Sequence, residues 1–271
     1  MGASQHPARA GVRISLTSHD RKPTTAMNDS SDSKPQYSRV LLKISGEALC
    51  APGGSGIDSD ELELIAKEIH AAAGQGAQLA VVCGGGNIIR GGELAATGKF
   101  DQASADYMGM LGTIINGLAL KEAIERLGQP ARVMSALSAT SVAERYIRPK
   151  ALRHLEKNRV VIFVGGTGNP FFTTDSAAAL RAAEIGADVV LKATKVDGIY
   201  DKDPNKHDDA VRYETLSFDE AIDKKLAVMD VTAFTMCRER GIPILVFDMK
   251  KPGNIAKVVA GATIGTRVSA E

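Results

Sequence analysis

Short apolar runs alternate with longer amphipathic stretches along the chain from residue 37 onward. The short runs are mostly Val, Ile, Leu and Ala, a pattern that predicts buried parallel strands. They are residues 40–44, 79–83, 132–135, 160–164, 188–191 and 244–247. The stretches between them predict helices at residues 58–73, 103–127, 143–157, 174–185 and 231–241. In the first helix, Ile65 and Ile69 recur at helical spacing, Asp58 is expected to cap the start, and Gly74 to mark the end.

Regular alternation of strands and helices implies βαβ crossovers and a mostly parallel sheet with helices on both faces. We expect residues 37–271 to form one such α/β domain. In sheets of this kind, ligands bind outside the carboxyl ends of the strands. The residues that follow the predicted strands are therefore the first place to look for chemistry.

The first 36 residues differ from the rest, being rich in Ser, Thr, Pro and charged residues without hydrophobic periodicity. They are predicted to be a disordered N-terminal extension. Residues 1–28 hold four basic residues and one acidic residue, a bias found in transit peptides. The favoured alternative is that Met27 is the natural start, so that residues 1–26 come from an upstream extension of the reading frame.

Composition argues against several function classes. The chain has 33 Lys+Arg against 32 Asp+Glu, a net charge of +1, and its few aromatic residues are seven Phe and five Tyr. Proteins that bind single-stranded nucleic acid use aromatic platforms and often basic grooves, so we expect no nucleic acid partner. The absence of any run of 18 apolar residues disfavours a membrane span.

Cysteine and histidine usage favours a reducing compartment. The three cysteines are widely spaced, and the five histidines form no cluster with them. This pattern predicts neither a disulfide framework nor a zinc site, and we expect no metal site built by protein side chains. A cytoplasmic protein is the expectation.

Three predicted strands run directly into glycine-rich loops, at residues 45–47, 84–86 and 165–168. Glycine lets backbone N–H groups approach an anion without a side chain in the way. One such loop is as easily a tight turn. Three loops at one edge of one sheet favour a large, highly phosphorylated ligand.

The loops do not match the commonest phosphate-binding motifs. The dinucleotide fingerprint G-x-G-x-x-G fails in the two later loops, because Ile89 and Phe171 occupy the position of its last glycine. The pair Gly98-Lys99 does not complete a Walker A loop, because Phe100 follows the lysine. Neither a Rossmann NAD site nor a P-loop is expected.

Charged residues lie among these loops. Lys43 interrupts an otherwise apolar strand, where a lysine is costly unless its ammonium reaches an anion or solvent. Arg90 follows the triple glycine and presents a planar fork suited to phosphate. Asp175 opens a helix after the third loop and is a candidate to orient lysines, with Lys192 a weaker candidate for charge stabilisation. The plainer alternatives are a lysine that reaches solvent, a surface ion pair and an N-terminal helix residue.

Five segments together resemble the bacterial UMP kinases of the amino-acid kinase superfamily. They are LKISGEAL at 42–49, GGGNIIRG at 84–91, DYMGM at 106–110, GTGNPFFTTD at 166–175 and KATKVDG at 192–198. The resemblance runs from about residue 37 to the C-terminus. It implies a three-layer αβα sandwich around a mostly parallel sheet, assembled as a homohexamer. It also implies transfer of the ATP γ-phosphoryl group to UMP with Mg²⁺, giving UDP and ADP for pyrimidine nucleotide biosynthesis, with UTP as a common inhibitor and GTP as a common activator.

The resemblance and the chemistry together give a set of candidate site residues. Lys43, Arg90 and Asp175 are the candidate catalytic residues. The residues expected at ATP are Lys43, Ile44, Ser45, Gly46, Gly86, Arg90, Thr194, Tyr200 and Asp203. The residues expected at UMP are Gly85, Asp106, Thr167, Gly168, Asn169, Pro170, Phe171, Phe172, Thr173 and Thr174. Asp230 matches a carboxylate retained in the family, and it is as readily a cap for the helix that starts at Val231.

Two other functions remain as alternatives. One is a superfamily member that phosphorylates a carboxylate or carbamate, such as an acetylglutamate or carbamate kinase. These would share the first two glycine loops but are not expected to carry TGNPFFTT. The other is a non-catalytic nucleotide-binding subunit, in which loss of Lys43 or Arg90 would be expected, and both residues are present.

Overall fold

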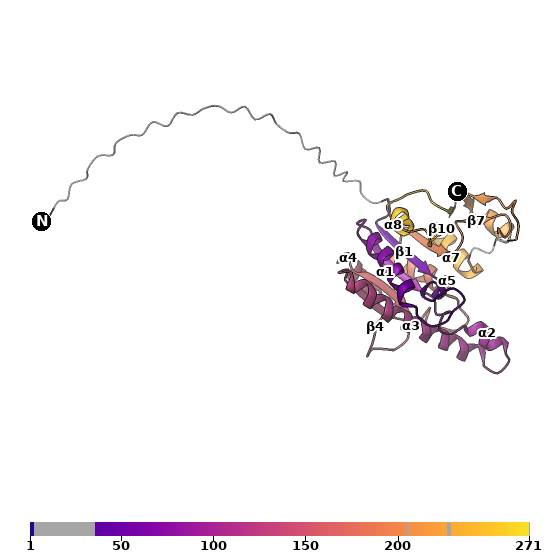
Figure 1. Ribbon diagram of the computed structural model, residues 1–271, viewed down its shortest axis with the longest axis horizontal. Helices are drawn as coiled ribbons and strands as arrows, with labels where there is room; N and C mark the ends of the chain where they lie inside the picture. The colour runs from indigo at the N-terminus through magenta and orange to yellow at the C-terminus, as the bar shows by residue number, and fades with distance from the viewer. Residues whose placement is uncertain (3–35, 205, 227–228, 271) are drawn as a thin grey trace, which may run out of the picture. The chain divides into compact units, whose positions relative to one another are not determined.

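A central sheet organises the part of the chain that the computed structural model describes, which is residues 1–2, 36–204, 206–226 and 229–270 (Figure 1). In these residues nine strands pair in the order β4-β3-β5-β2-β1-β6-β10-β11-β9. Every neighbouring pair is parallel except β10 and β11. The predicted disordered extension, residues 1–36, lies almost wholly outside the described residues.

The strands of the sheet are short, as expected for a buried parallel sheet. Their bounds are β1 Arg39–Ile44, β2 Gln78–Cys83, β3 Ala131–Ser135, β4 Glu144–Arg145, β5 Val160–Val164, β6 Val189–Thr194, β9 Thr215–Ser217, β10 Ile244–Asp248 and β11 Thr266–Ser269. A separate antiparallel hairpin joins β7 (Ile199–Tyr200) to β8 (Arg212–Tyr213).

Helices connect most of the strands. They are the 3-10 helix η1 Gly46–Leu49 and the α-helices α1 Ser59–Ala73, α2 Gly91–Ala96, α3 Gln102–Arg126, α4 Arg148–Glu156, α5 Thr174–Ile185, α6 Phe218–Asp223, α7 Val231–Arg240 and α8 Asn254–Val259. No helix of the described residues is long and apolar enough to cross a lipid bilayer.

Alternate residues of the strands feed two separate hydrophobic layers, because successive side chains of a strand point to opposite faces. Leu42 belongs to the layer that contains buried residues of α1, α3 and α8. Its neighbour Leu41 belongs to the layer that contains buried residues of α4, α5, α6 and α7. The result is the expected αβα sandwich, with helices on both sides of the sheet (Figure 1).

All six predicted strands are confirmed, with ends that shift by at most three residues. Four helices also agree closely with their predicted bounds, and Asp58 caps α1 by accepting from the N–H groups of Asp60 and Glu61. Strands β4, β9 and β11 were not predicted, because two to four residues carry too little pattern.

The helix predicted at residues 143–157 is wrong in its first third. Glu144 and Arg145 form strand β4 beside β3, and α4 begins only at Arg148. Pro149 stands at the first turn of α4. A helix starting at 143 would place that proline in its interior, where it lacks the N–H that the helix needs. Proline is tolerated in the first turn of a helix, where no intrahelical N–H bond is required, so α4 starts at Arg148, directly before it.

Candidate active site

The three glycine loops meet because the strands that carry them are neighbours. Strand β2 pairs with both β1 and β5, and all three run in the same direction. The contact between the first two loops is close. A Cβ atom on Gly46 would lie 2.7 Å from the carbonyl oxygen of Gly84 and 2.8 Å from the nitrogen of Gly86. Only glycine fits at position 46, because the first two loops are in direct contact there. The loops therefore share one edge of the sheet, as predicted.

Two lysines and one carboxylate form a cluster at this edge. Lys43 of β1 stands beside Lys192 of β6 in the strand register. The Nζ atom of Lys43 lies 2.9 Å from Oδ1 of Asp175, and the Nζ atom of Lys192 lies 2.8 Å from Oδ2. The three side chains are only 12–15% exposed. The cluster therefore carries a net positive charge in a largely dry place, which suits an anionic ligand.

The electrostatics of the cluster follow from this arrangement. Burial opposes the ionisation of Asp175, but Lys43 and Lys192 outweigh it and hold the pKa of the carboxyl below its usual value of 3.8. Burial lowers the pKa of Lys192, although Asp175 opposes that shift. Asp175 thus remains a carboxylate at neutral pH and holds the two ammonium groups side by side.

Asp175 owes its place to the start of α5. The hydroxyl of Thr173 accepts hydrogen bonds from the N–H groups of Asp175 and Ser176 at 3.0 and 3.2 Å, which caps the helix. The carboxylate lies in the first helical turn, where the helix dipole favours negative charge. Asp230 supports the same cap, because it accepts hydrogen bonds from the hydroxyls of Thr173 and Ser176.

Asp230 is itself the N-cap of α7. One of its carboxylate oxygens accepts from the N–H of Ala233 at 2.9 Å. The cap that the sequence offered as the plainer interpretation is therefore confirmed. The tertiary contact with the start of α5 adds to it, and links the two helices at the site.

Arg90 is not brought to the lysine cluster. Its guanidinium forms ion pairs with Glu47 and with Glu93, the latter at 2.9 Å, and the side chain is about half exposed. Glu47 also pairs with Lys195 at 3.0 Å. Hydrogen bonding to Lys195, together with the charges of Lys195 and Arg90, holds the pKa of Glu47 below its ordinary value, although burial opposes the shift. Arg90 therefore forms a surface ion pair, the alternative to phosphate binding that the sequence allows.

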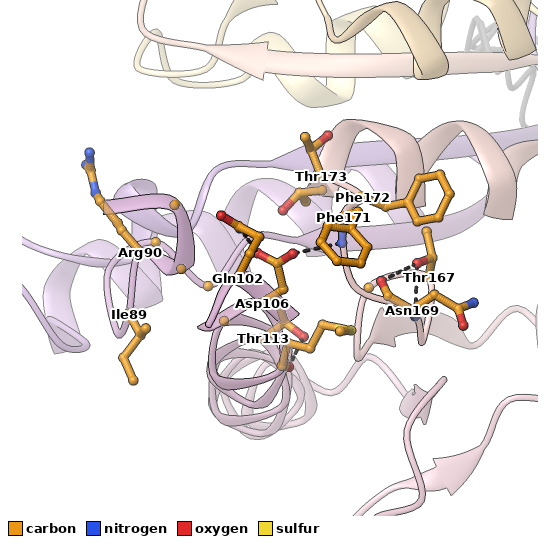
Figure 2. Close-up of a pocket in the computed structure, with 18 residues that line it drawn as sticks. Ile89, Arg90, Gln102, Asp106, Thr113, Thr167, Asn169, Phe171, Phe172 and Thr173 are labelled. Carbon is orange, nitrogen blue, oxygen red and sulfur yellow. Dashed lines mark hydrogen bonds between the residues drawn. The ribbon is translucent and has the colours of Figure 1, made fainter. Parts of the chain in front are cut away.

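A pocket of about 530 Å³ lies between α3 and the loop that precedes α5 (Figure 2). Its lining includes these residues predicted for the acceptor: Gly85, Asp106, Thr167, Asn169, Phe171, Phe172, Thr173 and Thr174. Gly86 and Arg90 also line it, whereas Gly168 and Pro170 are not among its lining residues. Figure 2 shows the Arg90 side chain pointing away from Asp106 and Phe171.

Asp106 organises the loop across the pocket. Its carboxylate accepts hydrogen bonds from the backbone N–H of Phe171 and from the side-chain amide of Gln102, both at 2.7 Å (Figure 2). Phe171 has a φ of +70°, a strained value for a residue with a side chain, and the residue is 73% exposed. The bond to Asp106 helps to hold this conformation, so that the carboxylate and the aromatic ring face one space.

A second pocket, of about 510 Å³, lies beyond Lys192. Its lining includes Thr194, Tyr200 and Asp203, the residues predicted for the adenosine end of ATP. The hydroxyl of Tyr200 donates to a carboxylate oxygen of Asp197 at 2.5 Å, which fixes the ring at the pocket. Of the predicted phosphate-loop residues, Ile44 has its side chain fully buried in the core, so only its backbone is available to a ligand.

Several residues that line the two pockets were not predicted from the sequence. Gln102, Met110 and Thr113 of α3 line the first pocket, and Lys224, Lys225 and Leu226 line the second. They lie far in sequence from the glycine loops, so spacing gave no signal. In the described residues no group of three or more His, Cys, Asp or Glu side chains is placed to hold a metal ion.

Comparison with known proteins places this geometry in context. The model of the amino acid kinase family matches residues 38–248. Uridylate kinases of Xanthomonas campestris pv. campestris and Xanthomonas oryzae pv. oryzae are 55% and 54% identical over 236 residues, which is 87% of this chain and 98% of each relative.

Solved structures agree in fold. The UMP kinase from Bacillus anthracis superimposes with a TM-score of 0.84 at 38% identity, covering 87% of this chain and 97% of that one. The UMP kinase from Ureaplasma parvum gives a TM-score of 0.80 at 39% identity, covering 85% and 98%.

Proposed function

This chain belongs to the amino acid kinase family, and we propose that it transfers the γ-phosphoryl group of ATP to UMP, giving UDP and ADP. The relatives and solved structures at 38–55% identity confirm the resemblance to bacterial UMP kinases drawn from the five segments. Such a reaction supplies a pyrimidine nucleoside diphosphate.

The observation that carries the proposal is the place of the lysine cluster between the two pockets. Thr174, the residue before Asp175, lines the first pocket, and Lys192 lines the second. The cluster holds two ammonium groups where the phosphate chains of ligands in the two pockets would meet. Phosphoryl transfer needs positioning and positive charge around the transferring group rather than covalent chemistry by the protein.

The roles of the residues follow from this placement. Lys43 and Lys192 stabilise charge on the phosphoryl oxygens, and Asp175 holds them in place. The N–H groups of the glycine loops keep donor and acceptor in line. The phosphate of UMP has a second pKa near 6, so it is mostly a dianion at neutral pH and needs no general base. Arg90 joins the phosphates only if it leaves Glu47 and Glu93.

The two pockets are proposed to divide the substrates as the resemblance implies. UMP occupies the pocket lined by Asp106 and residues 167–174, with Gly168 and Pro170 shaping the loop rather than lining it. ATP extends from the loop of Lys43, Ile44, Ser45 and Gly46 to the pocket of Tyr200. Mg²⁺ enters as a complex with ATP, whose phosphate oxygens are the ligands that this ion prefers.

The proposal also covers the oligomeric state, the cellular location and the regulation of the enzyme. We propose a homohexamer acting in the cytoplasm, inhibited by UTP and activated by GTP, with residues 37–271 as the kinase domain. An apolar stripe on α3, formed by Tyr107, Leu111 and Ile115, supports assembly, because each of its side chains is 42–53% exposed. The match of relatives over 236 residues supports the domain.

A substrate panel tests the proposed function. The protein is incubated with Mg-ATP and UMP, CMP, dTMP, acetylglutamate or carbamate, and release of ADP is measured. We expect turnover with UMP alone. Turnover only with an acid would favour the acetylglutamate or carbamate kinase alternative, and no turnover with any acceptor would favour a nucleotide-binding subunit.

A further inference from the structure

Helix α3 carries two buried polar side chains on a face that is otherwise apolar. Thr113 is 6% exposed and Asn116 is fully buried, whereas the neighbours Ile114 and Leu120 on the same helix belong to the hydrophobic core. Burying a polar group costs free energy unless it is hydrogen-bonded. The partners of Thr113 and Asn116 therefore show what these residues are for.

Asn116 holds the triple glycine loop. Its side-chain amide donates to the carbonyl oxygen of Gly84 at 2.7 Å and to Oδ1 of Asn87 at 2.6 Å. Asn87 returns a hydrogen bond to Oδ1 of Asn116 at 3.0 Å. The two amides form a closed, buried pair that fixes both ends of the loop against α3.

The same amide pair touches the first glycine loop. A Cβ atom on Gly46 would lie 2.6 Å from Oδ1 of Asn87, so the backbone at Gly46 rests directly on the pair. Asn87 also donates to the carbonyl oxygen of Gly56 at 2.7 Å. The position of the donor loop relative to the triple glycine loop thus depends on Asn116 through Asn87.

Thr113 holds the third glycine loop. Its hydroxyl donates to the carbonyl oxygen of Met110 and accepts from the N–H of Gly165, both at 2.7 Å. Gly165 begins the loop that leads to Phe171 and has a φ of +75°. The hydroxyl is one helical turn from Asn116, so a single helix face holds the acceptor loop and the triple glycine loop together.

Close packing leaves little room for these loops to adjust. A Cβ atom on Gly85 would lie 2.5 Å from the carbonyl oxygen of Gly109 and 3.1 Å from the nitrogen of Thr113. The triple glycine loop therefore lies directly on the backbone of α3. A shift of this helix would therefore move the glycine loops with it. Loss of the hydrogen bonds from Thr113 and Asn116 would leave the loops free to move relative to the helix.

We propose that Thr113 and Asn116 are positioning residues for phosphoryl transfer, Thr113 for the acceptor loop and Asn116 for the spacing between donor and acceptor loops. This inference rests on the proposed function. Thr113 lines the acceptor pocket, but its hydroxyl is engaged by Met110 and Gly165, so it acts through the loop. Asn116 acts through Gly84 and Asn87.

A matched pair of variants tests the role of Thr113. Thr113→Val keeps the shape and removes the hydroxyl, whereas Thr113→Ser keeps the hydroxyl. We expect Thr113→Val to raise the KM for UMP by about tenfold, the equivalent of one lost hydrogen bond, with the KM for ATP within about twofold of wild type. Thr113→Ser restores the KM for UMP to within about threefold. A purely structural role would lower the yield of folded enzyme and leave both KM values unchanged.

Asn116→Asp tests the second residue. The carboxylate still accepts from Asn87, but the donation to Gly84 and to Asn87 is lost. Because the triple glycine loop is proposed to contact both substrates, we expect both KM values to rise and kcat to fall. Unchanged kinetics for a folded Asn116→Asp enzyme would overturn the role of Asn116. If this variant does not fold, Asn116→Ala, which removes both donated hydrogen bonds without burying a charge, is measured instead with the same criterion.

Amide hydrogen exchange separates failure of this inference from failure of the proposed function, because it needs no substrate. In Thr113→Val we expect faster exchange at residues 165–168 with unchanged exchange in strands β1 and β2. Unchanged exchange in that loop would overturn the inference even if wild type phosphorylates UMP. A loop that loosens in the variant while wild type fails to phosphorylate UMP would instead refute the proposed function alone.

Discussion

The most unusual charged groups of the site are three mostly buried side chains, those of Lys43, Asp175 and Lys192. Two ammonium groups share one carboxylate at 2.8–2.9 Å in a site that is mostly shielded from water. The cluster has two positive charges and one negative charge, so its net charge is +1. A bound phosphate group would neutralise this buried positive charge, and the attraction between them favours binding.

Lys43→Ala is predicted to lower kcat by at least about a hundredfold, the scale found when a charge-stabilising group is removed from an active site. Folding is expected to change little, because Asp175 keeps its partner Lys192. Steady-state assays with UMP and thermal unfolding check both parts. Lys195→Ala is the matched control, since this lysine is 59% exposed and forms an ion pair with Glu47 rather than with Asp175. Near-normal turnover in Lys43→Ala would contradict the assignment.

Asp175→Asn is predicted to lower the free energy of unfolding by about 3 kcal/mol at pH 7, because two buried ammonium groups lose their counter-charge. The pKa of Asp175 lies below 3.8 in the folded state. Its contribution to stability is therefore present above pH 3.8 and is lost as the pH falls through the folded-state value. Urea unfolding of both proteins from pH 7 downward measures the difference. A difference that persists undiminished in acid would exclude this ion-pair origin.

Helix α3 is the element on which the site depends most. Its buried face packs on the sheet and holds two glycine loops, and its N-terminal turns supply Asp106 to the acceptor pocket. Glycine allows α3 to approach the sheet closely. A Cβ atom on Gly117 would lie 2.3 Å from a methyl carbon of Val164, the last residue of β5.

Gly117→Ala is predicted to destabilise the protein by about 1–3 kcal/mol through overpacking against Val164. Gly92→Ala in α2 is the control, because a Cβ atom there has no neighbour within 4 Å and alanine favours the helix. We expect Gly92→Ala to be neutral or stabilising by up to about 1 kcal/mol. Thermal and urea unfolding report both values, and equal stability of the two variants would refute the packing argument.

On the scale of the whole molecule, strand order decides where the site forms. The order β5-β2-β1-β6 places the three glycine loops and Lys192 at adjacent positions along one edge. On the outer side of α3, Tyr107, Leu111 and Ile115 repeat every four residues and remain exposed. An exposed apolar stripe on a helix of this length is typical of an interface between copies of a chain.

Leu111→Glu is predicted to reduce the oligomeric state, because it places a charge in the centre of the proposed interface. Sedimentation velocity of the variant and the wild type measures the change. Leu64→Glu is the matched control, since Leu64 is exposed to a similar extent, 56%, but lies on α1. Wild type that sediments as a monomer, or a hexamer that survives Leu111→Glu, would contradict this interface.

Much of the fold could be predicted from the sequence because strong local patterns coincide with the elements. The strands around Val81 and Ile162 are buried on both faces, so they are apolar at nearly every position. Short or interrupted elements could not be predicted correctly. Near Pro149, for example, a helix-like pattern continues upstream of the residue at which the helix begins. Many of the predicted site residues line one of the two pockets, since loops after parallel strands share an edge, but Gly168 and Pro170 line neither.

The sequence by itself determined the α/β fold class, the three glycine-rich loops and the lysine on an apolar strand, because each depends on local residue order. Only the tertiary structure decided which charges meet. It paired Asp175 with both lysines and turned Arg90 toward Glu47 and Glu93, and it placed Thr113 and Asn116 beneath the glycine loops. These contacts join residues that are far apart along the chain, and strand order and helix packing bring them within hydrogen-bonding distance.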